Sequence, residues 1–135
     1  MTNKNKIKGS TFERFATDLF NRFVKRSAWK RVPGSGMLGT LLGEPLLTSD
    51  ITGKVQAIPR KFNVEAKVGY GGETQFVLKK EWLDKVKQEA DSNFGIPMLV
   101  GKFSGAREGV KVFVVLDIQT FADLINMITD LTPEE

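Results

Sequence analysis

Three side chains in two short segments have the types and the spacing needed for chemistry on a phosphodiester bond. Glu65 and Lys67 lie two positions apart in "FNVEAKV", residues 62–68, where apolar and polar residues alternate as in a half-buried β-strand. Because residues two apart on a strand point to the same face, we expect the carboxylate and the amine to be neighbours. Asp50 lies far enough before Glu65 for a hairpin, and antiparallel pairing of the two segments would bring their carboxylates together.

Two neighbouring carboxylates in a partly buried cleft repel each other, and a divalent cation removes this repulsion. Such a cation could bind a phosphate oxygen and activate a water molecule as the nucleophile. Lys67 could orient that water or stabilise the charge that develops on the phosphate. Each residue also has a structural explanation: Asp50 could open the turn "DITG", and Glu65 and Lys67 could form a solvent-facing ion pair worth roughly a few tenths of a kcal/mol. The spacing alone leaves both interpretations open.

The chain of 135 residues contains no Cys and no His. The lack of Cys excludes disulfides, zinc ribbons and thiol nucleophiles. The lack of His excludes histidine-based triads, general bases and metal ligands. Catalysis would therefore depend on carboxylates, Lys, Arg, Ser, Thr or the single tyrosine, Tyr70. A metal would be held by oxygen atoms, which favours Mg²⁺ or Mn²⁺.

The formal net charge is +4, and basic residues crowd the first half of the chain. A basic surface favours polyanions such as nucleic acid, although an ordinary solvated charged surface explains the same excess equally well. The N-terminus lacks the apolar segment of a secretory signal, and no apolar run approaches the length of a membrane span. We therefore expect a cytoplasmic protein without a membrane partner.

Hydrophobic periodicity predicts a single α/β domain over residues 10–131, after a flexible basic arm (1–9) and before an acidic tail (132–135). The first helix is expected to begin at Ser10, and Glu13 would complete the capping-box signature S-x-x-E. Alternatively, Glu13 could contribute its carboxylate to the metal site of Asp50 and Glu65. The apolar but glycine-broken stretch 37–47 is expected to be a packed loop. Helices are predicted over 10–26, 79–91 and about 120–131, and strands over 28–32, 46–51 (ending near Asp50), 61–68, 96–103 and 111–117. The last two strands are nearly continuously apolar, which is typical of strands buried on both faces. The order predicts a central mixed five-stranded sheet flanked by helices.

Four segments, one of them within the strand already described, make the pattern more specific: "KGSTFERFATDLF", "RVPGSG", "VEAKV" and "GIPMLVGKF", in this order along the chain. Together they resemble the archaeal-type (Hjc-like) Holliday junction resolvases, a family that also occurs in phages. Asp50 followed by Glu65-x-Lys67 resembles the signature of the PD-(D/E)xK nuclease superfamily, with Ser49 in place of that superfamily's proline.

The resemblance implies a restriction-endonuclease-like fold and an Mg²⁺-dependent homodimeric endonuclease, with Mn²⁺ as a substitute, that nicks opposing strands of four-way DNA junctions. It implies a catalytic set of Glu13, Asp50, Glu65 and Lys67, to which Ser35 contributes from the loop after the first strand. Asp50, Glu65, Glu13 and the Ala66 carbonyl would hold the metal, and no small-molecule cofactor is expected. A nuclease for flaps, DNA ends or restriction targets, and a non-catalytic DNA-binding module, are the alternatives. Expected DNA contacts are Lys4, Lys6, Lys8, Arg14, Arg31, Ser35, Arg60 and Lys61.

Overall fold

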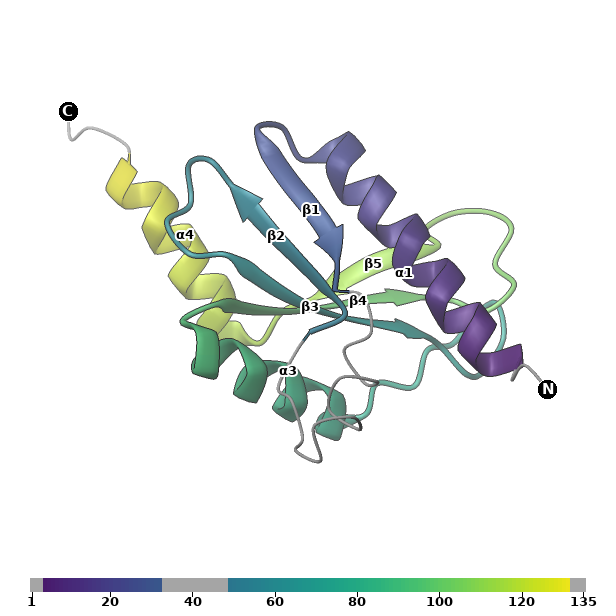
Figure 1. Ribbon diagram of the computed structural model, residues 1–135. Helices are drawn as coiled ribbons and strands as arrows, with labels where there is room; N and C mark the ends of the chain where they lie inside the picture. The colour runs from purple at the N-terminus through teal and green to yellow at the C-terminus, as the bar shows by residue number, and fades with distance from the viewer. Residues whose placement is uncertain (1–3, 33–48, 132–135) are drawn as a thin grey trace, which may run out of the picture.

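The strands form one mixed five-stranded sheet with three helices around it, in a computed structural model that describes residues 4–32 and 49–131 (Figure 1). The strands lie in the sheet in their order along the chain, β1-β2-β3-β4-β5. Neighbouring strands are antiparallel except β3 and β4, which are parallel and are connected through α3. The predicted fold class, α/β with a central mixed five-stranded sheet flanked by helices, is confirmed. The elements are α1 Lys4–Phe23, β1 Ser27–Arg31, β2 Ile51–Val55, β3 Phe62–Val68, α3 Lys80–Asn93, β4 Ile96–Lys102, β5 Val112–Val115 and α4 Ile118–Leu131.

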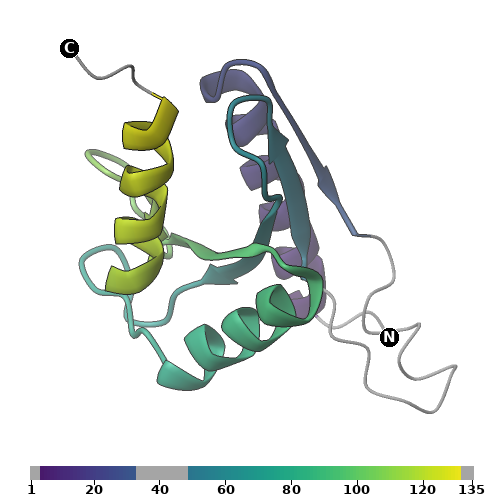
Figure 2. The same cartoon turned by 90° about the vertical axis from the view of Figure 1, so that its left-hand side faces the viewer.

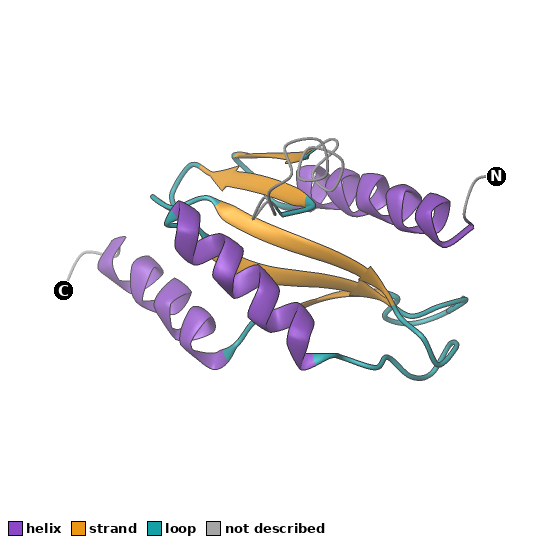
Figure 3. Ribbon diagram, turned by 60° about the horizontal axis from the view of Figure 1, so that its bottom comes forward, coloured by secondary structure: helices purple, strands orange, loops and turns teal. Residues whose placement is uncertain are grey.

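The alternation of side chains along β3 separates two helical layers. Val64 packs in the hydrophobic core with Phe12 and Ala16 of α1, whereas the next residue, Glu65, contacts Lys85 of α3. Because successive residues on a strand point to opposite faces, α1 covers one face of the sheet and α3 covers the other. Figure 3 shows α3 lying across the strands, and Figure 2 shows how the helices are placed around the sheet.

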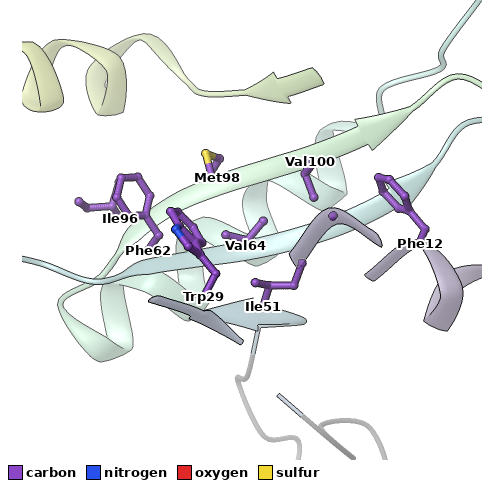
Figure 4. Packing of buried hydrophobic residues seen from close by; sticks show 9 residues of the cluster. Phe12, Trp29, Ile51, Phe62, Val64, Ile96, Met98 and Val100 are labelled. Atoms are coloured by element: carbon purple, nitrogen blue, oxygen red, sulfur yellow. The ribbon is translucent and has the colours of Figure 1, made fainter. Parts of the chain in front are cut away.

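The hydrophobic core lies on the α1 face of the sheet. The ring of Trp29 in β1 is stacked on Phe20 of α1 at a centroid distance of 4.4 Å and tilted against Phe62 of β3 at 5.3 Å. It also lies directly over Gly53 of β2, where a Cβ atom would come within 2.0 Å of the indole Cε3. Glycine therefore lets the ring approach the strand backbone closely. The buried cluster, drawn in Figure 4, consists of Phe12, Ala16, Trp29, Ile51, Phe62, Val64, Ile96, Met98 and Val100.

Three local predictions are wrong: the start of the first helix, the position of the second strand and the burial of the last strand. Helix α1 begins at Lys4, so part of the predicted arm is helical, and Ser10 lies inside the helix rather than at its N-cap. Strand β2 begins after Asp50 instead of ending there, because the segment "TGK" at 52–54 is extended and not a turn. Strand β5 is an edge strand with partly exposed side chains, because only β4 pairs with it.

Helix α4 is capped at its N-terminus and only half covered along its length. The Asp117 carboxylate accepts hydrogen bonds from the Thr120 N–H at 2.9 Å and the Thr120 hydroxyl at 2.7 Å. Partial burial opposes them, but these bonds lower the pKa of Asp117 below its ordinary value. Leu124 and Met127 pack against the core cluster. Five apolar side chains of α4 are exposed by 45% to 86%: Ile118, Phe121, Ile125, Ile128 and Leu131. Within residues 4–32 and 49–131, no helix is both long enough and apolar enough to cross a membrane.

Candidate active site

The candidate site begins where the pairing of β2 with β3 ends. Asp50 directly precedes β2, and its N–H donates a hydrogen bond of 3.0 Å to the carbonyl of Val64, the residue that already pairs with Ile51. The Asp50 Oδ2 atom accepts a hydrogen bond of 3.0 Å from the N–H of Ala66. The carboxylate is therefore fixed against the main chain of β3, between Glu65 and Lys67.

Glu65 occupies the α3 face of β3 and is only 2% exposed. Its Oε1 atom lies 3.4 Å from Lys67 Nζ and 3.3 Å from Lys85 Nζ. Its Oε2 atom is buried without a hydrogen-bond partner among the residues that the structure describes. Lys67 Nζ also lies 5.1 Å from the ring centroid of Trp82 in α3, a cation–π contact that holds the amine over this face of the sheet. The two charges of Glu65 and Lys67 are thus in contact, but on a covered face and not as a solvent-facing pair.

Lys85 and Glu89 of α3 also face this site, and sequence reasoning missed both. Lys85 Nζ lies 3.7 Å from Glu89 Oε1, and Glu89 is completely buried. A signal was present in the sequence: Glu89 lies three residues after Val86 and seven after Trp82, on the stripe of α3 that faces the sheet. A carboxylate within such an apolar stripe calls for a specific explanation.

The electrostatics of the site come from burial and from crowded negative charge. Burial raises the pKa of Glu65 and the Asp50 carboxylate raises it further, whereas the ammonium groups of Lys85 and Lys67 lower it, and the net change is upward. Burial, followed by the charge of Glu65, raises the pKa of Glu89 to about 7. Burial opposes the charged form of Lys85, but the carboxylates of Glu65 and Glu89 raise its pKa above the ordinary value. A cation is therefore favoured between these carboxylates.

Glu13 approaches the same charges from α1 but has a partner of its own. Its Oε2 atom lies 3.2 Å from Arg31 Nη2, and the same Nη2 atom donates a hydrogen bond of 2.9 Å to the Ser10 hydroxyl. Burial and the charge of Asp50 raise the pKa of Glu13, although the hydrogen bond from Arg31 opposes them. Arg31 thus ties the end of β1 to the middle of α1 and turns the Glu13 carboxylate toward itself.

The donor set of this site fits a hard divalent cation in its chemistry, because every candidate ligand is an oxygen atom. The unpartnered Oε2 atom of Glu65 is the kind of buried acceptor that a cation would satisfy. Across residues 4–32 and 49–131, however, no group of three acidic side chains lies close enough to hold an ion. In the described arrangement, Asp50 is bonded to β3, the strand that carries Glu65, while Glu13 is paired with Arg31.

The structure describes only some of the remaining predicted residues. Ser35 lies outside the described residues. Arg60 donates hydrogen bonds to the carbonyl oxygens of Phe94 (2.9 Å) and Gly95, so its guanidinium group joins the start of β3 to the end of α3. Arg14 of α1 and Lys61 are exposed, and Lys4, Lys6 and Lys8 belong to the first turns of α1. Their contacts with DNA stay predictions.

Comparison with solved structures supports the architecture. The structure of Hjc from Archaeoglobus fulgidus, described as a Holliday junction resolvase from an archaeal hyperthermophile, matches with a TM-score of 0.53 and 18% sequence identity. The match covers 84% of this chain and 92% of the other. At this identity the likeness concerns the fold. The comparison with curated protein sequences gives no match.

The fold carries an aspartate and a Glu-x-Lys pair where the pairing of β2 with β3 ends, which is the grouping that the sequence predicts for a nuclease site. The model of the family described as "Phage putative PDDEXK endonuclease" matches residues 4–132, and the chain belongs to this family. The expected membership in the superfamily is confirmed, and the protein is a PD-(D/E)xK endonuclease.

Proposed function

We propose that this endonuclease is a structure-selective, divalent-metal-dependent enzyme that nicks opposing strands of four-way DNA junctions. The observation that carries the proposal is the position of the Asp50 carboxylate, bonded to the Ala66 N–H and so placed between Glu65 and Lys67 on β3. The choice of a junction as the substrate rests on the order of the resolvase-like segments and on the fold shared with Hjc. Mg²⁺ is the proposed cation, with Mn²⁺ as a substitute.

Asp50 and Glu65 are the proposed metal ligands, with the Ala66 carbonyl as a third. The N–H and the C=O of one residue in an extended strand point toward the same neighbouring strand. Because the Ala66 N–H points to Asp50, its carbonyl oxygen faces the same side, beyond the last paired residue of β2. When bound, a divalent cation supplies charge neutralisation and lowers the pKa of a water molecule enough for attack on phosphorus. Glu13 would join this set after leaving Arg31.

Lys67 is the proposed catalytic amine. Its Nζ atom is held between Glu65 Oε1 and the Trp82 ring, so the ammonium group stays at the site and is only partly exposed. There it would donate a hydrogen bond to a phosphate oxygen or orient the attacking water, and either role stabilises the negative charge of the transition state. Ser35 is retained as a proposed contribution from the loop after β1.

Binding of the junction would depend on shape and backbone charge rather than on base sequence. The excess of basic residues in the first half of the chain supports this proposal, with contacts from the predicted residues of α1 and from Arg31 and Lys61. Affinity should therefore decrease steeply with salt concentration. The proposed place of action is the cytoplasm of a prokaryotic cell or of a phage host.

We also propose that the active form is a homodimer, because symmetric cuts in a twofold junction require two sites related by symmetry. The exposed apolar side of α4 is the proposed contact with the second copy. Phe121 and Leu131 are 54% and 60% exposed, and soluble monomers rarely display a continuous apolar patch of this kind. A helix of 14 residues is about 21 Å long, which provides the apolar centre of an interface of about 800 Å² per partner.

The activity is tested with purified protein and labelled four-way junction, duplex and flap DNA, with and without Mg²⁺. We expect nicks in opposing junction strands only with Mg²⁺, and a loss of at least about 100-fold in Asp50→Asn and Lys67→Ala. Lys54→Ala is the matched control, because Lys54 is an exposed lysine on the neighbouring strand β2. Cleavage of flaps or duplex in preference to junctions would establish the alternative nuclease. Junction binding without any cleavage would establish the non-catalytic module.

The dimer is tested by light scattering during gel filtration. We expect the wild type to be dimeric and Phe121→Asp to be monomeric, while Asn126→Asp, which adds the same charge at another exposed position of α4, stays dimeric. A monomeric wild type at tens of micromolar would refute this part of the proposal.

A further inference from the structure

Lys85 lies between two carboxylates that belong to different elements of the fold. Its Nζ atom is 3.3 Å from Oε1 of Glu65 in β3 and 3.7 Å from Oε1 of Glu89 in the next turn of α3. The two oxygen atoms therefore cannot be farther apart than the sum of these distances. Because Lys85 is 53% exposed while both carboxylates are buried, its flexible stem reaches into the site from solvent.

Apart from the ion pair with Lys85, the structure shows no contact that explains the burial of the Glu89 carboxylate within its described residues. Glu89 is 0% exposed, and neither carboxylate oxygen has a hydrogen-bond partner within the described parts of the chain. The other buried residues of α3 are Trp82, Val86 and Ala90, so an apolar side chain at this position would continue the stripe. Burying an unbonded carboxylate is costly. Such a group is retained when it serves a function.

The surroundings of Glu65 already hold two positive charges. Lys67 Nζ and Lys85 Nζ both lie within 3.4 Å of the same oxygen atom, Oε1. A divalent cation on Glu65 would be repelled by both ammonium groups, so at least one of them must move away. Lys67 extends from the same strand and rests against the Trp82 ring, whereas Lys85 has a second carboxylate, Glu89, already beside it.

We propose that Lys85 and Glu89 are positioning residues of the active site: Lys85 competes with the divalent cation for Glu65, and Glu89 is the carboxylate that receives the Lys85 ammonium group when the cation binds. The inference rests on the proposed metal dependence. It assigns neither residue as a metal ligand. It explains why a buried carboxylate lies one turn beyond Lys85 on the helix that covers the site.

The test is the dissociation constant for Mn²⁺, measured by calorimetry without DNA, for the wild type, Lys85→Met, Glu89→Gln and the double variant. Lys85→Met should bind Mn²⁺ about tenfold more tightly, because the competing charge is gone, and Glu89→Gln about tenfold more weakly. In the double variant the Glu89→Gln substitution should have no further effect, so its affinity should equal that of Lys85→Met. Lys87→Met is the matched control: Lys87 lies on the same helix, pairs with Asp91 and changes the net charge equally. It should leave the affinity within twofold of the wild type.

The possible results separate this inference from the proposed function. An unchanged or weaker affinity in Lys85→Met overturns the competition. An equal loss on Glu89→Gln in both backgrounds overturns the positioning role, since Glu89 would then act on the cation directly. A wild type that binds neither Mn²⁺ nor Mg²⁺ overturns the inference and the proposed metal dependence together. Thermal unfolding of each variant shows that the fold is retained, and a purely structural role for the pair would not produce the tighter binding expected for Lys85→Met.

Discussion

Substitution of the buried Glu89 by Gln should stabilise the protein at neutral pH and have little effect in mild acid. The pKa of Glu89 is raised from 4.5 to about 7, mainly by burial and then by the charge of Glu65. The folded state therefore holds the proton more tightly than the unfolded state does. The stability that the protonated form contributes is fully present below pH 4.5 and is lost as the pH rises through about 7.

The difference between the two pKa values sets the size of the effect. It corresponds to at most about 3 kcal/mol of unfolding free energy above pH 7. Because Gln has nearly the same shape and no charge, Glu89→Gln should remove this cost. The gain in stability should be near zero at pH 4.5, intermediate at pH 6 and about 2–3 kcal/mol at pH 8.

The assay is urea denaturation between pH 4.5 and 8 in the presence of EDTA, with Trp29 and Trp82 as fluorescent reporters. Glu81→Gln is the control, because Glu81 is an exposed glutamate in the first turn of the same helix. Its substitution should change stability by less than about 0.5 kcal/mol throughout. A stability difference between Glu89→Gln and the wild type that does not vary with pH would refute the reasoning.

Three further predictions concern the packing, the capping and the metal. Gly53→Ala should lower the unfolding free energy by about 1–3 kcal/mol in urea melts, because the new Cβ would collide with the Trp29 ring; an unchanged midpoint would contradict the contact. Asp117→Ala should lower it by about 1 kcal/mol through loss of the α4 cap, and Asp117→Asn, which can still accept the bond, by less; equal losses would show that the cap is not the cause. Mg²⁺ at 100 times its dissociation constant should stabilise the wild type by about 2.7 kcal/mol in thermal melts, whereas Asp50→Asn should show little of this effect; a full effect in the variant would exclude Asp50 as a ligand.

The parts of the site that depend on local geometry were predictable from the sequence. Strand alternation places Glu65 and Lys67 on one face wherever the strand lies, and antiparallel pairing brings Asp50 close to β3. The extent of β2 was not predictable, because "TGK" has the composition of a turn. The glycine leaves room for the Trp29 ring to pack on β2, and that contact comes from a different element.

Two local motifs were misjudged from the sequence. The capping box of Ser10 and Glu13 was given too much weight, and the pair of Lys85 and Glu89 in α3 was given too little. Ser10 and Glu13 have the spacing of a cap, but the helix continues to Lys4 and both side chains contact Arg31 of β1. Lys85 and Glu89 have the spacing of an ordinary exposed ion pair on a helix. Glu89 is buried between α3 and the sheet because of the way the helix packs. In the sequence, this burial is indicated only by the position of Glu89 on the apolar stripe of Trp82 and Val86.

The hydrogen bond from the Ala66 N–H to Asp50 has a consequence for the energetics of ion binding. One oxygen of the aspartate already accepts a hydrogen bond from the main chain, so the side chain is oriented before any ion arrives. The conformational entropy of the Asp50 side chain is thus lost when the protein folds and not when the ion binds. Of the two amines beside Glu65, Lys67 is held by the Trp82 ring, whereas Lys85 is 53% exposed, so differences in ion affinity among related chains should arise chiefly at Lys85.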